Sequence, residues 1–250
     1  MLKSIMTHIK KIIRKSPTVY NYLRDTYYGL FHAAEAMGFK LHESKWKKKN
    51  FDFHADFIEA MKHPHREYLI KKVENCHPLG NVLEVGCGSG QNLIILSKIF
   101  PEIMFHGIDI NPTFIDEGRK WCDHNGVTNV SLNIGEVTDL SMFADNFFFL
   151  AFSDAILIYV APQKIKRALS EMIRVTNRTL LLNEWHNEGV KFNQQSSWYY
   201  GHWVHNYRVL FEEMIPTPQF NITKIPENLW EPGGGWELYG SFMEVNLVKR

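Results

Sequence analysis

The sequence has few cysteines, almost no net charge and no long apolar run, and each shortage excludes a class of protein. Its three cysteines form no C-x-x-C pair and are too few to build a disulfide framework for 250 residues, so a reducing cytoplasm is the expected compartment. The 28 Lys and Arg residues balance 27 Asp and Glu residues, which leaves no general basic field for binding nucleic acid. The longest apolar stretch, 147–161, is interrupted by Ser153 and Asp154 and is shorter than the roughly 20 residues that cross a bilayer.

From residue 81 onward, short apolar runs alternate regularly with amphipathic segments. Strands are predicted at 81–85, 103–109, 129–134, 147–153 and 179–184. Helices are predicted between them at 91–100, 112–124 and 162–175. The last two helices begin at proline, which suits the first helical turn. The segments 220–226 and 238–248 are joined by a glycine-rich link too short for a crossover helix, so we expect an antiparallel pair at one edge of the sheet. The pattern predicts an α/β fold with a doubly wound parallel sheet.

The first 80 residues follow a different pattern. Two helical stretches, 2–15 and 55–76, flank polar and aromatic sequence that includes the basic run 45–49. No acidic residue precedes Asp25, and the helix at 2–15 combines apolar spacing with positive charge. Such a helix can lie on an anionic membrane surface or dock on the domain as a lid, and we favour the lid. Residues 1–50 are therefore predicted to form a basic helical cap on the domain at 51–250, with residues 1–24 as the one region for peripheral membrane contact.

A glycine-rich turn at 86–90 is the sharpest local feature. Glu84 and Val85 end a predicted strand, Gly86-Cys87-Gly88-Ser89-Gly90 follows, and a predicted helix begins at Gln91. The three glycines let a ligand touch the backbone, and the N–H groups at the start of the helix favour a polar group. A dinucleotide site would have a glycine in place of Gln91, and the Glu84 carboxylate would repel a pyrophosphate. The loop therefore predicts a nucleotide-like cofactor that carries a positively charged amino group.

Two motifs, E-V-G-C-G-S-G at 84–90 and H-G-I-D-I-N at 106–111, resemble the signature of class I S-adenosylmethionine-dependent methyltransferases. The resemblance covers about residue 53 to the C-terminus. It implies a Rossmann-like seven-stranded sheet that ends in a reversed hairpin, and S-adenosylmethionine as the cofactor. The glycines would pass under the methionine and ribose of the cofactor, and Glu84 would support its amino group. Asp109 would take both ribose hydroxyls, and Ile110 would line the adenine.

The run N-V-S-L-N-I-G-E-V-T-D-L at 129–140 resembles the third-strand motif of the same family. Glu136 would accept from the adenine amino group, although Asp is commoner there, and the N–H of Val137 would meet a ring nitrogen. Ser153 would offer its backbone carbonyl to the amino group of the cofactor. The cofactor residues implied by the resemblance are Glu84, Gly86, Cys87, Gly88, Gly90, Asp109, Ile110, Glu136, Val137 and Ser153.

Methyl transfer from a sulfonium depends mainly on orienting the acceptor, and a hydroxyl acceptor also benefits from a base. His186 is the first candidate because it comes just past the fifth predicted strand, although it can equally be a structural histidine. His202 and His205 would share a helix face at their i, i+3 spacing. Asp154, after the fourth strand, can act on the substrate or cap the following turn. A metal is not expected, since no third ligand is evident near these histidines.

Aromatic residues gather at 185–207, which we interpret as a substrate lid. Flat apolar walls suit a sugar face, an aromatic ring or a cationic amine, although the same residues can simply pack the lid onto the sheet. The substrate-binding candidates are Tyr159, Trp185, Trp198, Tyr199, Trp203 and His205. We predict O-methylation of a small-molecule or glycan acceptor. The alternatives are a cofactor-binding partner subunit without activity and an N-methyltransferase acting on an amine or protein. A nucleic-acid substrate is disfavoured by the balanced charge and by the absence of an N/D-P-P-Y/F run after the fourth strand.

Overall fold

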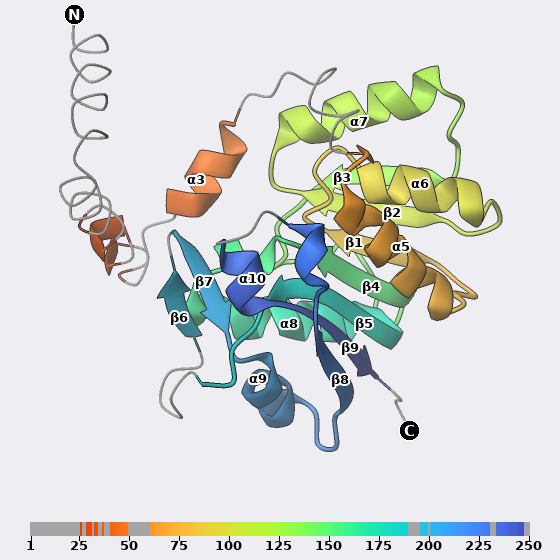
Figure 1. The fold of residues 1–250 in the computed structure, drawn as a ribbon. Helices are drawn as coiled ribbons and strands as arrows, with labels where there is room; N and C mark the ends of the chain where they lie inside the picture. Colours follow the sequence, from red (N-terminus) through yellow and green to blue (C-terminus); the bar gives the residue numbers. More distant parts are fainter. Residues whose placement is uncertain are drawn as a thin grey trace, which may run out of the picture.

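The computed structural model describes residues 26, 29–31, 33–34, 37, 41–49, 61–189, 196–199, 201–230 and 234–247. Their centre is a seven-stranded sheet in the order β3-β2-β1-β4-β5-β9-β8 (Figure 1). Its strands are β1 (Val82–Val85), β2 (Phe105–Asp109), β3 (Val130–Ile134), β4 (Phe148–Asp154), β5 (Thr176–Trp185), β8 (Gln219–Lys224) and β9 (Gly240–Asn246). Strands β1 to β5 pair in parallel, whereas β9 pairs antiparallel with both β5 and β8. The predicted Rossmann-like sheet with its antiparallel last pair is confirmed.

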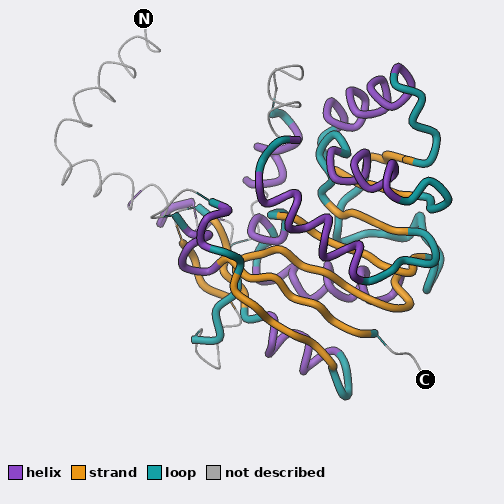
Figure 2. The backbone as a smooth tube through the Cα atoms, turned by 45° about the vertical axis from the view of Figure 1, so that its right-hand side comes forward, coloured by secondary structure: helices purple, strands orange, loops and turns teal. Residues whose placement is uncertain are grey.

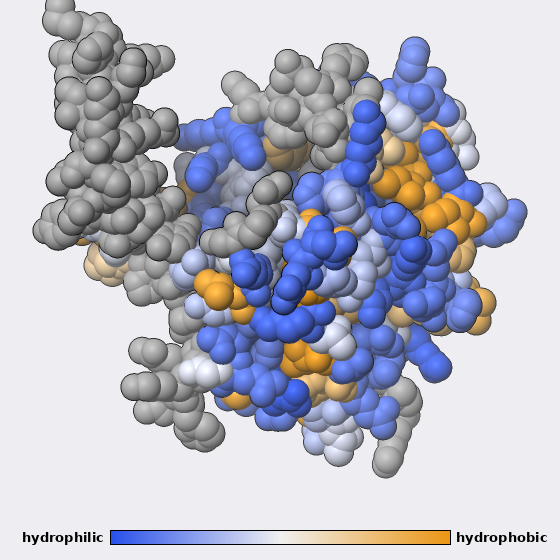
Figure 3. Space-filling model, in the orientation of Figure 1, coloured by the Kyte–Doolittle hydropathy of each residue, from blue (hydrophilic) through white to orange (hydrophobic). Residues whose placement is uncertain are grey.

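Helices cover both faces of the sheet (Figure 2). One face carries α5 (Pro64–Asn75), α6 (Gln91–Ile99) and α7 (Pro112–His124), and the other carries α8 (Pro162–Val175) and α9 (Tyr207–Met214). On α8 the buried residues include Ile165, Leu169 and Met172, which recur at helical spacing and face one core. Figure 3 shows the resulting surface: hydrophilic side chains cover most of this face, and hydrophobic ones gather mainly over α6 and α7. The apolar face of α8 packs on the sheet and its polar face is left to solvent, which explains how the helix forms a layer over the sheet.

The boundaries of helices and strands in the structure agree closely with the predicted ones where the sequence carries a strong local signal. The predicted helices at 112–124 and 162–175 match α7 and α8 residue for residue. The helix predicted at 55–76 is interrupted, because Met61 is helical, residues 62 and 63 leave the helix, and α5 begins only at Pro64 after an extended His63 (φ −63°, ψ 131°). A proline has no N–H and disfavours helical backbone at the preceding residue. Residues 50–60 and the helix predicted at 2–15 lie outside the described residues.

The segment predicted as an aromatic lid contains a separate hairpin of β6 (Ser196–Tyr199) and β7 (His202–His205). The prediction that His202 and His205 share a helix face is therefore wrong. Both lie on a strand, where residues three apart point to opposite faces. Accordingly, His205 is fully buried and His202 is half-buried.

The short helix α3 (Leu41–Lys47) lies near the β6–β7 hairpin and the carboxyl edge of the sheet (Figure 1). His42 Nε2 bonds to the carbonyl of Gly201 at 2.8 Å. Asn111 donates from Nδ2 to the carbonyl of Trp46 at 2.8 Å. These two bonds anchor α3 to distant segments of the chain. Within the described part of the chain, no helix is long and apolar enough to cross a membrane.

Candidate active site

A cavity of about 300 Å³ lies where the carboxyl ends of β1, β2 and β4 meet. The chain runs from β1 outward to β3 in one direction and then returns to place β4 on the other side of β1. Open α/β sheets bind ligands at such a switch point. His42, Glu43 and Trp46 of α3 also line the cavity and thus cover it.

The glycine loop lines the cavity, and at Gly86 no larger residue fits. Gly86 has φ +71°, and a Cβ atom on it would lie 2.2 Å from Cγ1 of Ile156. The N–H groups of Gly86 and Cys87 both donate to the carbonyl of Ile108, at 2.8 and 2.9 Å. The loop is therefore pinned to β2 while Gly88 lies open to the cavity.

Asp109, the last residue of β2, is fixed by backbone donors. Its Oδ2 atom accepts from the N–H of Gly88 at 2.9 Å, and its Oδ1 atom accepts from the N–H of Asn111 at 2.8 Å. Burial raises the pKa of Asp109, and the backbone donors oppose that rise. The carboxylate is thus held rigidly beside the glycine loop, with lone pairs left for further donors.

Glu136 and Val137 line the opposite wall, just after β3. Glu136 Oε1 accepts from the Thr138 hydroxyl at 2.8 Å and lies 3.7 Å from Nζ of Lys164. Lys164 also contacts Glu43 of α3. An ion-pair cluster therefore joins this wall to the covering helix.

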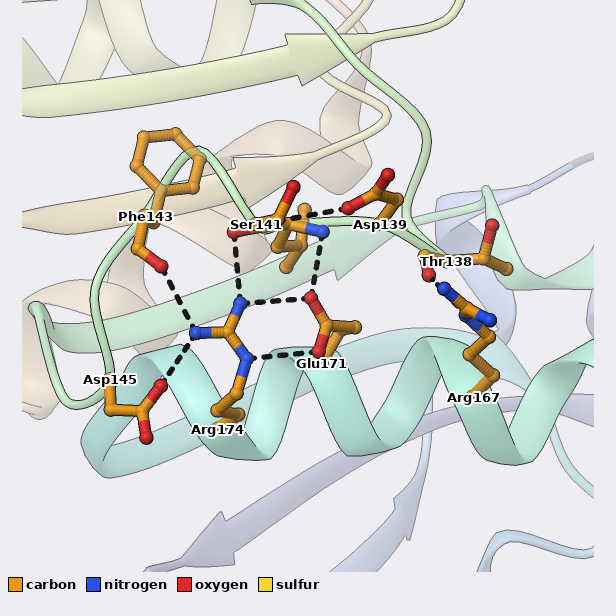
Figure 4. Close-up of polar contacts among 9 residues, drawn as sticks. Thr138, Asp139, Ser141, Phe143, Asp145, Arg167, Glu171 and Arg174 are labelled. Atoms are coloured by element: carbon orange, nitrogen blue, oxygen red, sulfur yellow. Dashed lines mark hydrogen bonds and ion pairs between the residues drawn. The ribbon is translucent and has the colours of Figure 1, made fainter.

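The loop that follows Glu136 and Val137 is held by arginines of α8 (Figure 4). Arg167 donates to the carbonyl of Thr138 at 2.8 Å. Arg174 donates to the carbonyls of Leu140 and Phe143, both at 3.0 Å. It also pairs with the carboxylates of Asp145 and Glu171. The helix thereby fixes the backbone of the loop that forms this end of the cavity.

Glu84 lies at the other end of the cavity and is only 2% exposed. Its Oε1 atom accepts from Nδ2 of Asn92 at 2.7 Å. Its Oε2 atom has no hydrogen-bond partner among the described residues. Burial raises the pKa of Glu84 well above its usual range. A buried carboxylate oxygen without a partner is costly, so this position favours a ligand that carries a donor or a positive charge.

Asp154, at the end of β4, lines the cavity beside Glu84 and is surrounded by donors. Its Oδ2 atom accepts from Nε2 of His65 at 2.9 Å and from Nδ2 of Asn92 at 3.2 Å. Its Oδ1 atom accepts from Nδ2 of Asn183 at 2.8 Å. Burial by itself would raise the pKa of Asp154, but His65, Arg66 and Asn183 together lower it to about 2. This carboxylate is therefore ionised at neutral pH.

Aromatic rings close the cavity on the side of α3. The ring of Tyr159 lies 5.0 Å from the Trp46 ring, 5.5 Å from the His42 ring and 5.1 Å from the His202 ring, centroid to centroid. Burial raises the pKa of Tyr159 to about 12, so its hydroxyl stays neutral. The cavity thus has a flat aromatic wall near an ionised carboxylate.

Comparison with known proteins identifies the domain that carries this cavity. Residues 82–179 match the methyltransferase domain family. The fold resembles magnesium protoporphyrin IX methyltransferase from Synechocystis, solved with bound S-adenosylmethionine, with a TM-score of 0.55 and 13% identity over 90% of this chain and 95% of that chain. It also resembles geranyl diphosphate C-methyltransferase from Streptomyces coelicolor, with a TM-score of 0.58 and 13% identity over 80% and 87% of the two chains. Residues 82–179 form a methyltransferase domain, and the chain shares its fold with these two methyltransferases.

The curated relatives match this chain over short segments. A tRNA (guanine-N(7)-)-methyltransferase of Porphyromonas gingivalis is 39% identical over 69 residues, which are 28% of each chain. An aklanonic acid methyltransferase of Streptomyces is 41% identical over 54 residues, 21% of this chain and 24% of that protein. An uncharacterised protein of Rickettsia prowazekii is 30% identical over 113 residues, 45% of this chain and 19% of that protein. The matches thus span less than a third of these relatives.

Many of the residues expected at the site do line the cavity. They are Glu84, Gly86, Cys87, Gly88, Asp109, Ile110, Glu136, Val137, Asp154 and Tyr159. Gly90 instead begins α6 in a left-handed conformation, with φ +83°. Ser153 is fully buried within β4, one residue before the cavity-lining Asp154.

His186 lies outside the set of described residues that line the cavity. It is 6% exposed, and its Nδ1 atom accepts from the N–H of Tyr207 at 3.2 Å. Burial lowers the pKa of His186. The structure therefore places it behind the wall, and its catalytic role stays a prediction.

The aromatic candidates of the lid pack behind Tyr159. Trp185 is buried in a cluster with Ile158 and Val204, which Tyr199 joins from its edge. Trp203 is 2% exposed. Trp198 pairs with Trp203 across the hairpin, and its side chain lies outside the described residues. Their arrangement supports the wall that Tyr159 presents to the cavity.

His205 supports the wall more directly. Its Nε2 atom lies 3.2 Å from the carbonyl of Leu157 and 3.0 Å from that of Val160, at the two ends of the short helix η1 (Leu157–Tyr159) and its cap. Burial lowers the pKa of His205 to about 4, so the ring is neutral and donates to these carbonyls. His205 thus fixes the segment that carries Tyr159.

Sequence reasoning missed several polar residues of the site. Arg66 donates from Nη1 to Oδ1 of Asn92 at 2.6 Å, which orients the Asn92 amide toward Glu84 and Asp154. His65 and Arg66 come from α5, far from the glycine loop in the sequence. The signals that existed were the His63-x-His65 pair and the place of Asn92 in the first turn after the loop.

Proposed function

We propose that this chain transfers the methyl group of S-adenosylmethionine to a hydroxyl oxygen of a small-molecule or glycan acceptor. The observation that carries the proposal is the ionised Asp154 carboxylate, which lines the cavity between the glycine loop and the aromatic wall at Tyr159. A carboxylate accepts the hydrogen bond of a hydroxyl, whereas the flat wall suits the apolar face of a sugar or ring.

The residues present fit this cofactor. The Oε2 atom of Glu84 has no hydrogen-bond partner among the described residues, so it suits a donor such as an amino group. The glycine loop leaves the space that a side chain would fill, and Asp109 offers acceptors at the end of β2, where a ribose is held in related folds. When bound, S-adenosylmethionine supplies an electrophilic methyl group on a positively charged sulfur. We assign Glu84 to its amino group, Asp109 to its ribose and Glu136 with Val137 to its adenine.

The chain's own contribution is to orient the acceptor and receive its proton. Asp154 would accept the hydrogen bond of the acceptor hydroxyl and, once the methyl group is on the oxygen, would take the hydroxyl proton. Orientation within near-attack distance supplies much of the rate in such displacements. Because Asp154 is a weak base, its main effect is to align the oxygen, and proton transfer follows bond formation.

Incubation with methyl-labelled cofactor and fractionated cell extract tests the proposal. We expect label in a small-molecule or glycan fraction as a base-stable methyl ether. Asp154→Asn should lower turnover strongly, whereas Asp116→Asn on the exposed face of α7 should not. Label on an amine or protein would replace the hydroxyl acceptor with a nitrogen acceptor. Calorimetric binding of S-adenosylhomocysteine without label in any fraction would favour a partner subunit without activity.

We further propose that residues 1–50 form a cap on the domain at 51–250. The cavity contacts of His42, Glu43 and Trp46 support this assignment. Residues 1–24 lie outside the described residues, and their membrane contact stays an open prediction. Liposome co-sedimentation of the full chain against one that starts at Asp25 separates the two roles, because only a membrane segment makes the full chain pellet more.

A further inference from the structure

His65 occupies an unusual position at the start of α5. It is 7% exposed, and its ring stacks on the ring of Trp230 with centroids 4.7 Å apart and planes at 27°. Trp230 stacks in turn on Trp236 at 4.5 Å and 6°. Both tryptophans belong to the segment between β8 and β9. The ring of His65 is therefore clamped in place by residues from the far end of the chain.

Both ring nitrogens of His65 have partners. Its Nε2 atom lies 2.9 Å from Oδ2 of Asp154, and its Nδ1 atom lies 2.6 Å from Nδ1 of His63. An ionised carboxylate only accepts, so Nε2 carries the hydrogen of this bond. Because Asn92 and Asn183 also donate to Asp154, the carboxylate has a fixed orientation.

The charges around Asp154 show how the hydrogen bond from His65 affects its ionisation. Two positive or donating groups face it from α5, His65 and Arg66, whereas the carboxyl groups of Glu84 on β1 and Glu184 on β5 lie close on the sheet side. Burial also disfavours an ionised carboxyl. Without His65, burial would drive Asp154 toward its protonated form.

We propose that His65 is a positioning residue that keeps the Asp154 carboxylate ionised and aimed at the methyl acceptor. The inference rests on the proposed function for what Asp154 does, but the state of Asp154 can be measured without turnover. A protonated Asp154 would carry an O–H donor of its own, so it would no longer accept the hydrogen bond of the acceptor hydroxyl in the orientation that the carboxylate imposes. His65 thus acts on the reaction through Asp154 and does not itself touch the acceptor.

The test uses two substitutions of graded severity and one matched control. In His65→Gln the side-chain amide reaches the position of Nε2 and keeps a neutral donor toward Asp154. In His65→Asn the amide stops short, and the bond is lost. His124→Gln is the control, because it makes the same chemical change at an exposed histidine at the end of α7, away from His65 and Asp154.

The first readout is the carboxyl ¹³C shift of Asp154 in aspartate-labelled protein from pH 8 to pH 5, assigned with Asp154→Asn. We expect no titration of Asp154 in the wild type or in His124→Gln. Titration should enter this range in His65→Gln and occur at still higher pH in His65→Asn. S-adenosylhomocysteine binding at pH 8 verifies that each variant is folded. Identical Asp154 titration in the wild type and both His65 variants would overturn the inference.

The second readout is the pH profile of kcat with the acceptor found by labelling. When the pKa of Asp154 lies one unit above the assay pH, about one tenth of the carboxyl is ionised. We therefore expect kcat of His65→Gln to fall about tenfold on the acid side of its profile, while the wild type stays flat there. If the wild type shows no turnover, the proposed function fails, but the ¹³C measurement still tests the effect of His65 on Asp154. Equal scaling of kcat at every pH would show that His65 is merely structural.

Discussion

Glu184 offers a quantitative test of the electrostatics beneath the active site. It lies on β5 with no exposed surface, and its two carboxyl oxygens accept from the N–H groups of Ile156 and Ile158 at 3.1 and 3.3 Å. Burial raises the pKa of Glu184 from its ordinary value of 4.5 to about 8, although the backbone donors oppose the rise. The carboxyl is therefore protonated in the folded protein at neutral pH. The perturbation is Glu184→Gln, which removes the titration and keeps the shape.

The magnitude follows from proton linkage. Between pH 4.5 and pH 8 the folded chain holds a proton on Glu184 that the unfolded chain has released. The folded state then binds more protons, so its stability falls as pH rises, by about 1.4 kcal/mol per unit once the unfolded carboxyl is ionised. From pH 5 to pH 8 the wild type should lose about 3–4 kcal/mol through this group. The glutamine variant has no such loss.

Glu184→Gln also lowers the free energy of unfolding by an amount that does not depend on pH. A glutamine has one acceptor oxygen, so it leaves one of the N–H groups of Ile156 and Ile158 without its partner, at about 1–3 kcal/mol. We therefore expect Glu184→Gln to be less stable than the wild type at pH 5 and more stable at pH 8. The two curves of unfolding free energy against pH should cross between these values.

Urea denaturation at pH 5, 6, 7 and 8 measures this difference directly. Other groups titrate equally in both proteins, so subtracting the two curves isolates Glu184. Glu227→Gln is the matched control, because Glu227 is exposed on the short helix η2 (Glu227–Leu229) and should give parallel curves. A stability difference between Glu184→Gln and the wild type that stays constant with pH would refute the reasoning.

Three further predictions address the cavity and its frame. Asp109→Asn should raise the calorimetric Kd for S-adenosylhomocysteine about 10- to 100-fold, because a charged acceptor is lost, whereas Asp116→Asn should leave it unchanged. Arg174→Ala should lower the unfolding free energy in urea by about 2–3 kcal/mol, since its bonds to loop carbonyls and carboxylates are lost; Lys166→Ala, which removes an exposed ion pair on the same helix, should cost less than about 1 kcal/mol. Tyr159→Ala should raise the acceptor KM about tenfold in steady-state assays while the Kd of the cofactor product changes less than about threefold; a larger cofactor effect would move Tyr159 out of the acceptor wall.

The parts of the fold that the sequence predicted well carry local signals. The helices α7 and α8 begin at prolines whose fixed φ suits a first turn, and their apolar spacing continues to the last residue. The glycine loop is equally local, because Gly86 and Gly90 both need positive φ. Asp109 follows from its place at the end of the next strand. Chain neighbours decide all of these features, so a pattern of spacing is enough to find them.

The parts that the sequence could not predict depend on contacts between distant segments. His65 and Asp154 are 89 positions apart, and no local pattern reports that α5 brings them together. The position of His186 just after β5 predicts a side chain in the cavity, but the β6–β7 hairpin packs against His186 and buries it. With 12 histidines in the chain, position after a strand alone cannot select one. The i, i+3 spacing of His202 and His205 fits a helix and a strand alike, and the hairpin partner decides between them.

Two neighbouring carboxyl groups show how the fold divides its roles. Asp154 is paired in register with Asn183, the residue before Glu184, yet the pKa of Asp154 is lowered to about 2 and that of Glu184 is raised to about 8. Both are buried, so burial cannot explain the difference. Asp154 has His65 and Arg66 beside it, whereas Glu184 has mainly backbone N–H groups and the negative charge of Asp154. Environments that separate two such values assign an ionised carboxylate to one task and a neutral acid to another. The ionised Asp154 faces the cavity, where the proposed acceptor hydroxyl would meet it, and the neutral Glu184 accepts from the N–H groups of Ile156 and Ile158 behind the cavity wall.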